Sequence, residues 1–386
     1  MGSPPLPLRP RRIAIVVNAN ARRFARDRSL IGAVEAATRG EATVHVTDSR
    51  ETLATAARAI IDGAIDAVII CSGDGGYGSV VTAIHAAAAT SGDSSAARPL
   101  PRFVFGPGGT VGTVARALGM SWGRDLVGGV RRAVKLALAA RDASEFDGER
   151  HRDARFRLQP TLAVSSRGHA TRLAFIFGTG LVARFFEVYA PADPTKPMTS
   201  DAVSDAASDA DPELRWAPSS GAGLVAAARI VGGIFVDSFY YGPRARAVLD
   251  PMPCRILVDG EPLAWGASSL VVGAVVRDLG LGMRVTYRAA EEAARPHFVV
   301  SGLSARELGP RMPRVLLGGP IVATGDVRRR RHFDDLASTL DVEFGANGAS
   351  GDDVGPFVVD GDLVRGARVH VAAGPTIRVL AFSPDA

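Results

Sequence analysis

The chain has 386 residues, of which 47% are hydrophobic and 22% are charged, so it is long enough for about two globular domains and is not mostly disordered. Lys and Arg outnumber Asp and Glu by 45 to 40, a formal net charge of +5, and Lys135 and Lys196 are the only lysines. A P-loop needs a lysine directly after its glycine-rich turn, and a protein kinase needs one on an early strand, so the sequence excludes both classes. A phosphate bound by this chain would be held by backbone N–H groups, Arg, Ser, Thr or a metal.

The two cysteines, Cys71 and Cys254, lie far apart and make neither a disulfide framework nor a zinc site. They favour a reduced, cytoplasmic setting. No stretch approaches about 18 uninterrupted apolar residues, and residues 1–12 lack the apolar core of a signal peptide, so we expect no membrane span. The small basic excess suits acidic small molecules or an anionic membrane surface and does not indicate nucleic-acid binding.

The first part of the chain predicts strands that alternate with helices. Residues 1–12 are rich in Pro and Arg and are expected to form a flexible arm. Strands are expected at residues 13–17, 42–46, 66–71 and 102–105, and helices at 29–38, 51–61, 79–89 and 126–140, with another helix ending at Leu118. This alternation is typical of a parallel sheet with right-handed crossovers.

After about residue 150, short strands are separated by Gly, Pro and Asp turns, which is typical of an antiparallel sandwich or barrel. The expected strands are residues 155–165, 171–177, 255–258, 268–276, 283–287, 298–300, 314–317, 357–359, 368–371 and 376–381. The predicted fold class is therefore α/β plus all-β: a doubly wound parallel-sheet domain over residues 13–145, then an antiparallel β-sandwich over residues 146–386. In the second domain we expect a flexible acidic loop at 191–213 and an apolar helix at 220–241, which is either buried in the core or seeks a surface.

Two glycine-rich loops follow predicted strands of the first domain. The first is Cys71–Gly76 (CSGDGG), and the second is Gly106–Thr113 (GPGGTVGT). Glycines let a phosphate approach the backbone, and the N-terminus of a following helix attracts anions. Because ligands of doubly wound sheets bind at the carboxyl ends of strands, the pair predicts a nucleotide site built from backbone. Asp74 would contact a metal there or accept a proton from an attacking hydroxyl; an ordinary Gly-Asp turn is the alternative.

Three further turns carry polar residues. Asn18, followed by two arginines, comes after the first strand and would either hold nucleotide phosphates or form a solvated turn. Asp360-Gly361-Asp362 follows the strand GPFVV, and Asp259-Gly260-Glu261 is an earlier near-copy. Asp-Gly pairs are common in hairpin turns, and at least one of these two is expected to be only a turn.

The order of these features resembles the lipid kinase superfamily, which includes diacylglycerol kinases, sphingosine kinases and bacterial lipid kinases. An Asn turn follows strand one, SGDG stands at Ser72–Gly75 as in sphingosine kinases, and a Pro-x-Gly-Thr loop begins at Pro107 and continues into Ala115-Arg116. The stretch 357–382 looks like the closing strands of the family, with an acidic turn of the DGE type. The resemblance is good over residues 11–145 and looser over 150–386.

The resemblance implies an ATP-dependent kinase that transfers the γ-phosphate to the hydroxyl of diacylglycerol or a sphingoid-like lipid, with ATP in the interdomain cleft and Mg²⁺ on the phosphates. The nucleotide-binding residues carried over are Asn18, Thr47, Ser72, Gly73, Asp74, Gly75, Gly76, Gly109 and Thr110. The proton acceptor would be Asp362, as in bacterial relatives, or Asp74, as in sphingosine kinases, and both stay open.

We expect ATP and a lipid as partners, a cytoplasmic protein in peripheral contact with the inner membrane face, and no nucleic acid. A homodimer is compatible with the sequence. Residues 328–331, all arginine, would touch anionic headgroups or form a solvated loop.

Several motif positions depart from the family. The Thr of the usual GGDGT is Gly76, the following Asn-Glu pair is Gly78 and Ser79, and the Asn-Asp of the second loop is Gly112 and Thr113. Arg295-Pro296-His297 replaces an Asp-Gly segment that carries a structural Mg²⁺ in bacterial lipid kinases. These losses support one alternative, an impaired pseudokinase that binds nucleotide or lipid. An NAD kinase-like enzyme is a second alternative, although we find no Asn-Glu pair placed for its substrate ribose.

Overall fold

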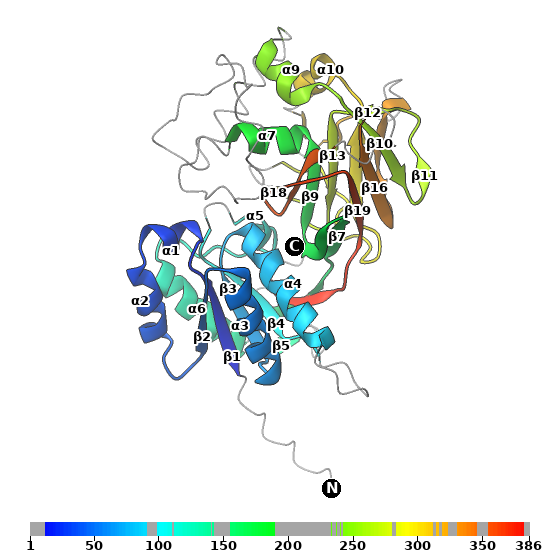
Figure 1. Cartoon of the computed structure of the whole chain (residues 1–386). Helices are drawn as coiled ribbons and strands as arrows, with labels where there is room; N and C mark the ends of the chain where they lie inside the picture. The colour runs from blue at the N-terminus through cyan, green and yellow to red at the C-terminus, as the bar shows by residue number, and fades with distance from the viewer. Residues whose placement is uncertain are drawn as a thin grey trace, which may run out of the picture. The chain divides into compact units, whose positions relative to one another are not determined.

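The computed structural model of the chain describes residues 12–90, 99–109, 112–139, 141–142, 155–189, 233, 237, 240, 242–279, 283–311, 314–315, 319–322, 330–345 and 354–381. The chain divides into two compact units (Figure 1). The first comprises residues 1–109, 118–158 and 377–385, and the second comprises residues 110–117 and 159–376. The predicted arm, apart from Arg12, and the predicted acidic loop lie outside the described residues, as does most of segment 220–241.

The first unit is built on a sheet of strand order β2-β1-β3-β4-β20-β6-β5. Its strands are β1 (Ile13–Asn18), β2 (Thr43–Thr47), β3 (Ala67–Cys71), β4 (Arg102–Gly106), β5 (Arg141–Asp142), β6 (Arg155–Gln159) and β20 (Ile377–Ala381). The strands from β2 to β20 in this order run parallel. Every residue of β3, and all of β1 except Asn18, is buried, because a central parallel strand is covered on both faces.

Helices cover both faces of this sheet (Figure 1). They are α1 (Arg22–Arg26), α2 (Ser29–Ala37), α3 (Arg50–Asp62), α4 (Asp74–Thr90) and α6 (Leu126–Ala139). Helix α3 packs against α4, and α2 packs against α6. Ser49 begins α3 with a capping box, in which its hydroxyl accepts the N–H of Thr52 at 3.2 Å.

The second unit contains two antiparallel sheets among its described residues. One has the order β11-β10-β16-β19-β7-β8, with β12 beside β10, and the other has the order β15-β14-β13-β9-β17-β18. The strands are β7 (Leu162–Ser166), β8 (His169–Ala174), β9 (Ile176–Gly180), β10 (Met252–Val258), β11 (Glu261–Pro262), β12 (Ala267–Ser268), β13 (Leu270–Ala274), β14 (His297–Ser301), β15 (His332–Leu336), β16 (Thr339–Phe344), β17 (Gly355–Val359), β18 (Asp362–Gly366) and β19 (Arg368–Ala373).

Short helices accompany these sheets. They are α5 (Thr113–Ala117), α7 (Leu181–Tyr189), α9 (Pro243–Leu249) and α10 (Ala305–Leu308), with a 3-10 turn at Gly309–Arg311. Helix α7 packs on β9 and β17. A buried apolar cluster joins α9, α10, β13 and β14, and it includes Val248, Val272, Val299 and Leu308.

The predicted fold class, a parallel α/β domain followed by antiparallel sheets, is confirmed, but two strand predictions are wrong and one predicted strand belongs to the other sheet. Residues 376–381 were expected in the second domain, yet β20 lies between β4 and β6 of the first sheet. Residues 283–287 form no strand and lead into turns, and Arg314 and Val315 are helical. Apolar spacing in such short runs does not separate a strand from a helix or a turn.

Candidate functional site

Three loops of the first unit meet at the carboxyl ends of β1, β3 and β4. The side-chain amide of Asn18 donates a hydrogen bond from Nδ2 to Ser72 Oγ at 3.0 Å. The backbone N–H of Gly109 donates to the carbonyl of Ser72 at 2.8 Å, and that of Arg23 donates to the carbonyl of Gly108 at 3.3 Å. The loops that the sequence analysis singled out separately therefore form one connected structure.

The two glycine-rich loops approach each other backbone to backbone. A Cβ on Gly108 would lie 2.7 Å from Ser72 N, and a Cβ on Gly109 would lie 2.5 Å from Gly73 Cα. No real Cβ comes so close, so these two positions exclude any other residue. The glycines are thus required by the contact between the loops as well as by any approaching ligand.

Helix α4 begins at Asp74, whereas the sequence predicts a loop up to Gly78 and a helix from Ser79. The N–H groups of Gly76 and Tyr77 donate to the carbonyl of Gly73 at 3.0 and 3.2 Å, which closes the first turn directly after β3. The first N–H groups of this helix therefore emerge inside the glycine-rich loop. Asp74 stands in the first turn, where the helix dipole favours an acid.

Tyr77 joins α4 to β4 from the buried side. Its hydroxyl donates to the carbonyl of Gly106 at 2.7 Å, and its ring stacks on Phe105 with the centroids 4.6 Å apart. Burial raises the pKa of Tyr77 well above its ordinary value, and the negative charge of Asp74 adds to this. Tyr77 thus has a structural role, which the sequence analysis did not assign.

Thr47 and Asn18 lie side by side on β2 and β1. They are partners in the parallel register of the two strands. The buried hydroxyl of Thr47 donates to the carbonyl of Val17 at 3.3 Å, and Asn18 Oδ1 accepts the N–H of Asn20 at 2.9 Å. Asn18, Ser72 and Gly109 are thus brought together, with Thr47 beside Asn18, whereas Thr110 lies outside the described residues.

The second predicted proton acceptor, Asp362, belongs to the second unit. It begins β18, is half exposed, and accepts a hydrogen bond from Arg172 of β8 at 2.6 Å. On the same strand, Arg365 pairs with Glu187 of α7 at 2.6 Å. Burial raises the pKa of Glu187 above its ordinary value, although the nearby Arg365 and Arg184 oppose this.

The neighbouring acid Asp360, noted in the sequence as part of an Asp-Gly turn, is buried. It is 3% exposed and has a positive φ of 49°. Its Oδ1 accepts the N–H groups of Phe175 and Ile176 at 2.9 and 2.8 Å, between β8 and β9. A sign of this burial in the sequence is that Asp360 directly follows the apolar strand GPFVV.

A buried polar cluster begins at the end of the segment Arg295-Pro296-His297. This is the segment that stands where bacterial lipid kinases are expected to carry a metal-binding Asp-Gly segment. His297 is fully buried, and its Nε2 lies 2.8 Å from Asp334 Oδ1, while His332 Nε2 lies 3.8 Å from Asp334 Oδ2. Burial alone would raise the pKa of Asp334, but the two histidines outweigh it and lower that pKa to about 2. Within the described ranges, no group of three or more His, Cys, Asp or Glu side chains is arranged to hold a metal ion.

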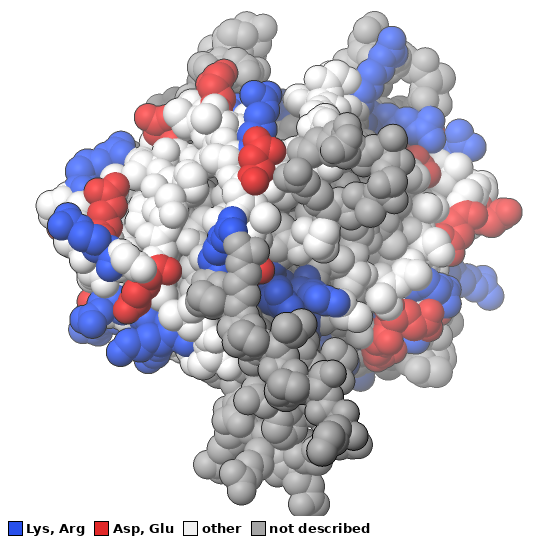
Figure 2. All heavy atoms as spheres, turned by 90° about the horizontal axis from the view of Figure 1, so that it is seen from below, with Lys and Arg blue, Asp and Glu red and all other residues white. Residues whose placement is uncertain are grey.

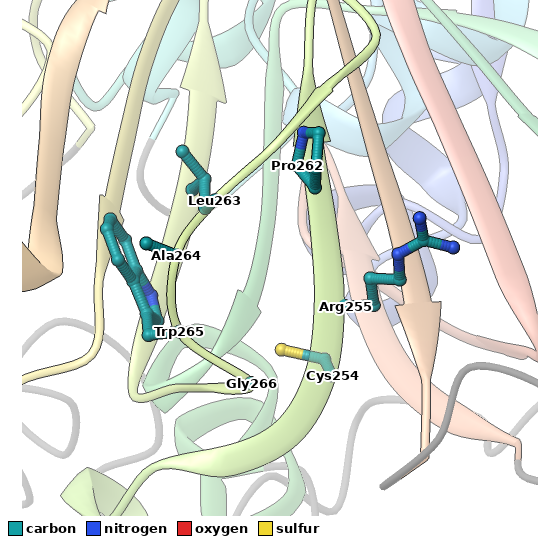
Figure 3. A pocket seen from close by; sticks show the side chains of 7 residues that line it. All are labelled: Cys254, Arg255, Pro262, Leu263, Ala264, Trp265 and Gly266. Atoms are coloured by element: carbon teal, nitrogen blue, oxygen red, sulfur yellow. The ribbon is translucent and has the colours of Figure 1, made fainter.

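A pocket of about 400 Å³ lies on the second unit between β10 and residues 262–266 (Figure 3). Its lining is Cys254, Arg255, Pro262, Leu263, Ala264, Trp265 and Gly266. Burial raises the pKa of the Cys254 thiol, so this sulfur is not an activated nucleophile. The Trp265 indole already donates to Ser268 Oγ at 3.1 Å, and the pocket therefore offers shape rather than catalytic chemistry.

The charges on the face seen in Figure 2 are mixed, with basic and acidic side chains interspersed over its described part. Where its residues are described, this face therefore has no large area of a single charge sign that would attract an oppositely charged ligand or membrane from a distance. Among the described helices, none has the length and apolar character needed to cross a membrane.

The comparison with protein families gives the decisive observation. Residues 12–143 match the model of the diacylglycerol kinase catalytic domain. This part of the chain is similar to the diacylglycerol kinase catalytic domain. The match includes β1 to β4 and both glycine-rich loops, so the resemblance identified from the motifs is confirmed. No curated protein matches the sequence.

Solved structures extend the likeness of fold beyond the kinase domain. A diacylglycerol kinase from Bacillus anthracis str. Sterne aligns with a TM-score of 0.52 at 12% identity, covering 97% of both chains. A second structure from that organism, provisionally described as a diacylglycerol kinase, aligns with a TM-score of 0.53 at 13% identity over 99% of both. An NAD kinase from Archaeoglobus fulgidus in complex with ATP reaches a TM-score of 0.39, which is too low to carry an argument.

Proposed function

We propose that the protein is an ATP-dependent kinase that transfers the γ-phosphate to the hydroxyl of a lipid of the diacylglycerol or sphingoid class. The observation that carries the proposal is the connected set of loops after β1, β3 and β4, in which Asn18 binds Ser72 and Gly109 binds the Ser72 carbonyl. In this family domain, the loops leave backbone N–H groups at the N-terminus of α4 for phosphate oxygens.

The chain's own residues would divide the work. Backbone N–H groups at Gly73–Gly75 would bind the phosphates, with Asn18, Thr47 and Gly109 beside the nucleotide. Phosphoryl transfer is mainly a matter of positioning and electrostatic stabilisation, which fits a site without lysine. A carboxylate, Asp74 or Asp362, would accept the proton of the lipid hydroxyl.

Mg²⁺ suits the donors near the loops. In nucleotide sites this ion is usually held by one or two carboxylates together with the phosphates, and Asp74 supplies one carboxylate in the first turn of α4. When bound, the ion would neutralise part of the phosphate charge. Asp74 is therefore the residue that would hold it, unless Asp74 is the proton acceptor.

The test is transfer of ³²P from labelled ATP to diacylglycerol and to sphingoid bases in mixed micelles, with Mg²⁺ or Mn²⁺. The expected result is a phosphorylated lipid, with turnover reduced about 100-fold or more in Asp74→Asn. Asp48→Asn is a matched control, since this exposed acid follows β2 and is not among the predicted site residues. Absence of any labelled lipid with all substrates and both metals would reject the proposal.

The second candidate is a pseudokinase that binds nucleotide or lipid without turnover. It is favoured by the pairing of Asp362 with Arg172 and by glycines at positions 78 and 112, where the family pattern has polar side chains. It predicts heat on titration with an ATP analogue but no labelled product. Peripheral membrane contact is part of the first proposal, and flotation of the protein with anionic vesicles tests it separately.

A further inference from the structure

Ser72 is a buried hydroxyl whose own hydrogen is not used within the described part of the chain. It is 1% exposed and accepts a hydrogen bond from Asn18 at 3.0 Å. Among the described residues, its Oγ donates to no acceptor, although a buried donor left unpaired is costly. The arrangement therefore leaves one donor, already oriented by Asn18, at the start of α4.

Gly76 is a glycine because Ser72 occupies the space of its side chain. A Cβ built on Gly76 would lie 1.8 Å from Ser72 Oγ, 2.6 Å from Ser72 Cβ and 3.4 Å from Asn18 Nδ2. Gly76 does not have a positive φ, so its backbone would accept other residues. Gly32 in α2 is a useful contrast, because a Cβ there would meet nothing within 4 Å.

We propose that residues 72 and 76 share a single side-chain position at the N-terminus of α4, meaning that a side chain on either residue would occupy the same space. In this chain the Ser72 side chain occupies that space and donates its hydroxyl hydrogen to a phosphate oxygen of the nucleotide. Asn18 acts as a positioning residue for that hydroxyl. This inference rests on the proposed function for the identity of the ligand. It also accounts for the missing threonine at position 76: the hydroxyl comes from the preceding turn instead of the helix.

The first experiment measures affinity for the ATP analogue AMP-PNP with Mg²⁺ by calorimetry, using the full chain. Ser72→Ala removes the donor and should bind about tenfold more weakly, as expected for a hydrogen bond to a charged group. Ser72→Gly should lose a similar amount. The double variant Ser72→Gly/Gly76→Ser returns the hydroxyl from the other position and should bind within about threefold of wild type. Equal affinity of wild type and Ser72→Ala would overturn the assignment.

The second experiment tests the shared position by thermal unfolding without nucleotide. Gly76→Ala should lower the melting temperature, whereas Gly32→Ala, with open space around it, should not. Adding Ser72→Gly to Gly76→Ala should restore the melting temperature, but adding Ser72→Ala should not, because the Ser72 Cβ itself lies 2.6 Å from the new methyl. Full stability of Gly76→Ala alone would reject the shared position.

A third comparison separates positioning from bulk stability. If Asn18 acts through Ser72, Asn18→Ala and Ser72→Ala together should weaken AMP-PNP binding by less than the product of their single effects. Independent effects would remove the positioning role. If wild type binds no nucleotide, the proposed function and the phosphate contact both fail, while the unfolding experiment still decides whether residues 72 and 76 share one position.

Discussion

Two hairpin turns of the second unit have the same backbone in different surroundings. Asp259-Gly260 joins β10 to β11, and Asp360-Gly361 joins β17 to β18. The φ angles are 50° and 84° in the first and 49° and 91° in the second. In both, the aspartate accepts two consecutive backbone N–H groups of another segment: Asp259 those of Ser338 and Thr339, and Asp360 those of Phe175 and Ile176.

The difference lies in what surrounds them. Asp259 and Glu261 are exposed, whereas Asp360 is buried and Asp362 is paired with Arg172. Phe186 of α7 approaches Gly361, with its ring atoms 3.9 Å from where a Cβ would lie. A short Asp-Gly sequence therefore determines a turn, but the elements packed on that turn determine whether its acids are candidates for chemistry.

The largest expected effect is on stability, from Asp360→Ala. The N–H groups of Phe175 and Ile176 lose their buried acceptor, and Ala replaces Asp at a positive φ, so the free energy of unfolding should fall by roughly 4 kcal/mol. Denaturant titration of the full chain measures it. Asp360→Asn keeps an acceptor oxygen and tolerates this φ, so it should lose clearly less. Equal losses in the two variants would contradict the role given to Oδ1.

The next effect concerns turnover. If Asp362 accepts the lipid proton, Asp362→Asn should lower kcat about 100-fold with little change in KM for ATP. Glu261→Gln is the matched control, because it removes the acid at the corresponding position of the other hairpin, and it should leave kcat unchanged. Normal turnover in Asp362→Asn, together with a loss in Asp74→Asn, would assign the proton transfer to Asp74.

Low pH should reduce the stability of the sheet that contains the β17-β18 hairpin, and the responsible residue is Asp334 on β15. Its pKa is lowered to about 2 in the folded chain, from an ordinary value near 3.8. Stability from this shift is present above about pH 4 and is lost as the pH falls through about 2, and it amounts to roughly 2 kcal/mol. Asp334→Asn should therefore be less stable than wild type at pH 6, with the difference narrowing on acidification. A constant difference between pH 6 and pH 2 would contradict this origin.

The smallest effect is expected for Asp259→Ala. It breaks the same two hydrogen bonds as Asp360→Ala and places Ala at the same φ, but solvent can satisfy the freed N–H groups. A loss of about 1 kcal/mol is expected from the same denaturant titration. The difference between the two alanine variants isolates burial, and losses of equal size would show that the surroundings of the hairpins do not matter.

Much of this arrangement follows from the sequence, because apolar runs and glycine loops are local signals. The strands at 13–17, 66–71 and 102–105 were predicted within one or two residues, since buried parallel strands are continuous apolar runs. The sequence does not predict the start of α4 at Asp74, because consecutive glycines argue against a helix and the reason for Gly76 is its contact with the Ser72 side chain. The burial of Asp360 was also missed, because its partners are almost 200 residues earlier in the chain.

The position of β20 has a consequence for how the protein is made. This strand is the last that the structure describes, yet it lies inside the first sheet, with β4 on one side and β6 on the other. During synthesis, the nucleotide-binding loops leave the ribosome long before the strand that completes their sheet. The first unit is therefore expected to reach its final form only after the whole second unit has been made, and a chain that stops before Ile377 would lack an inner strand of the sheet that supports those loops.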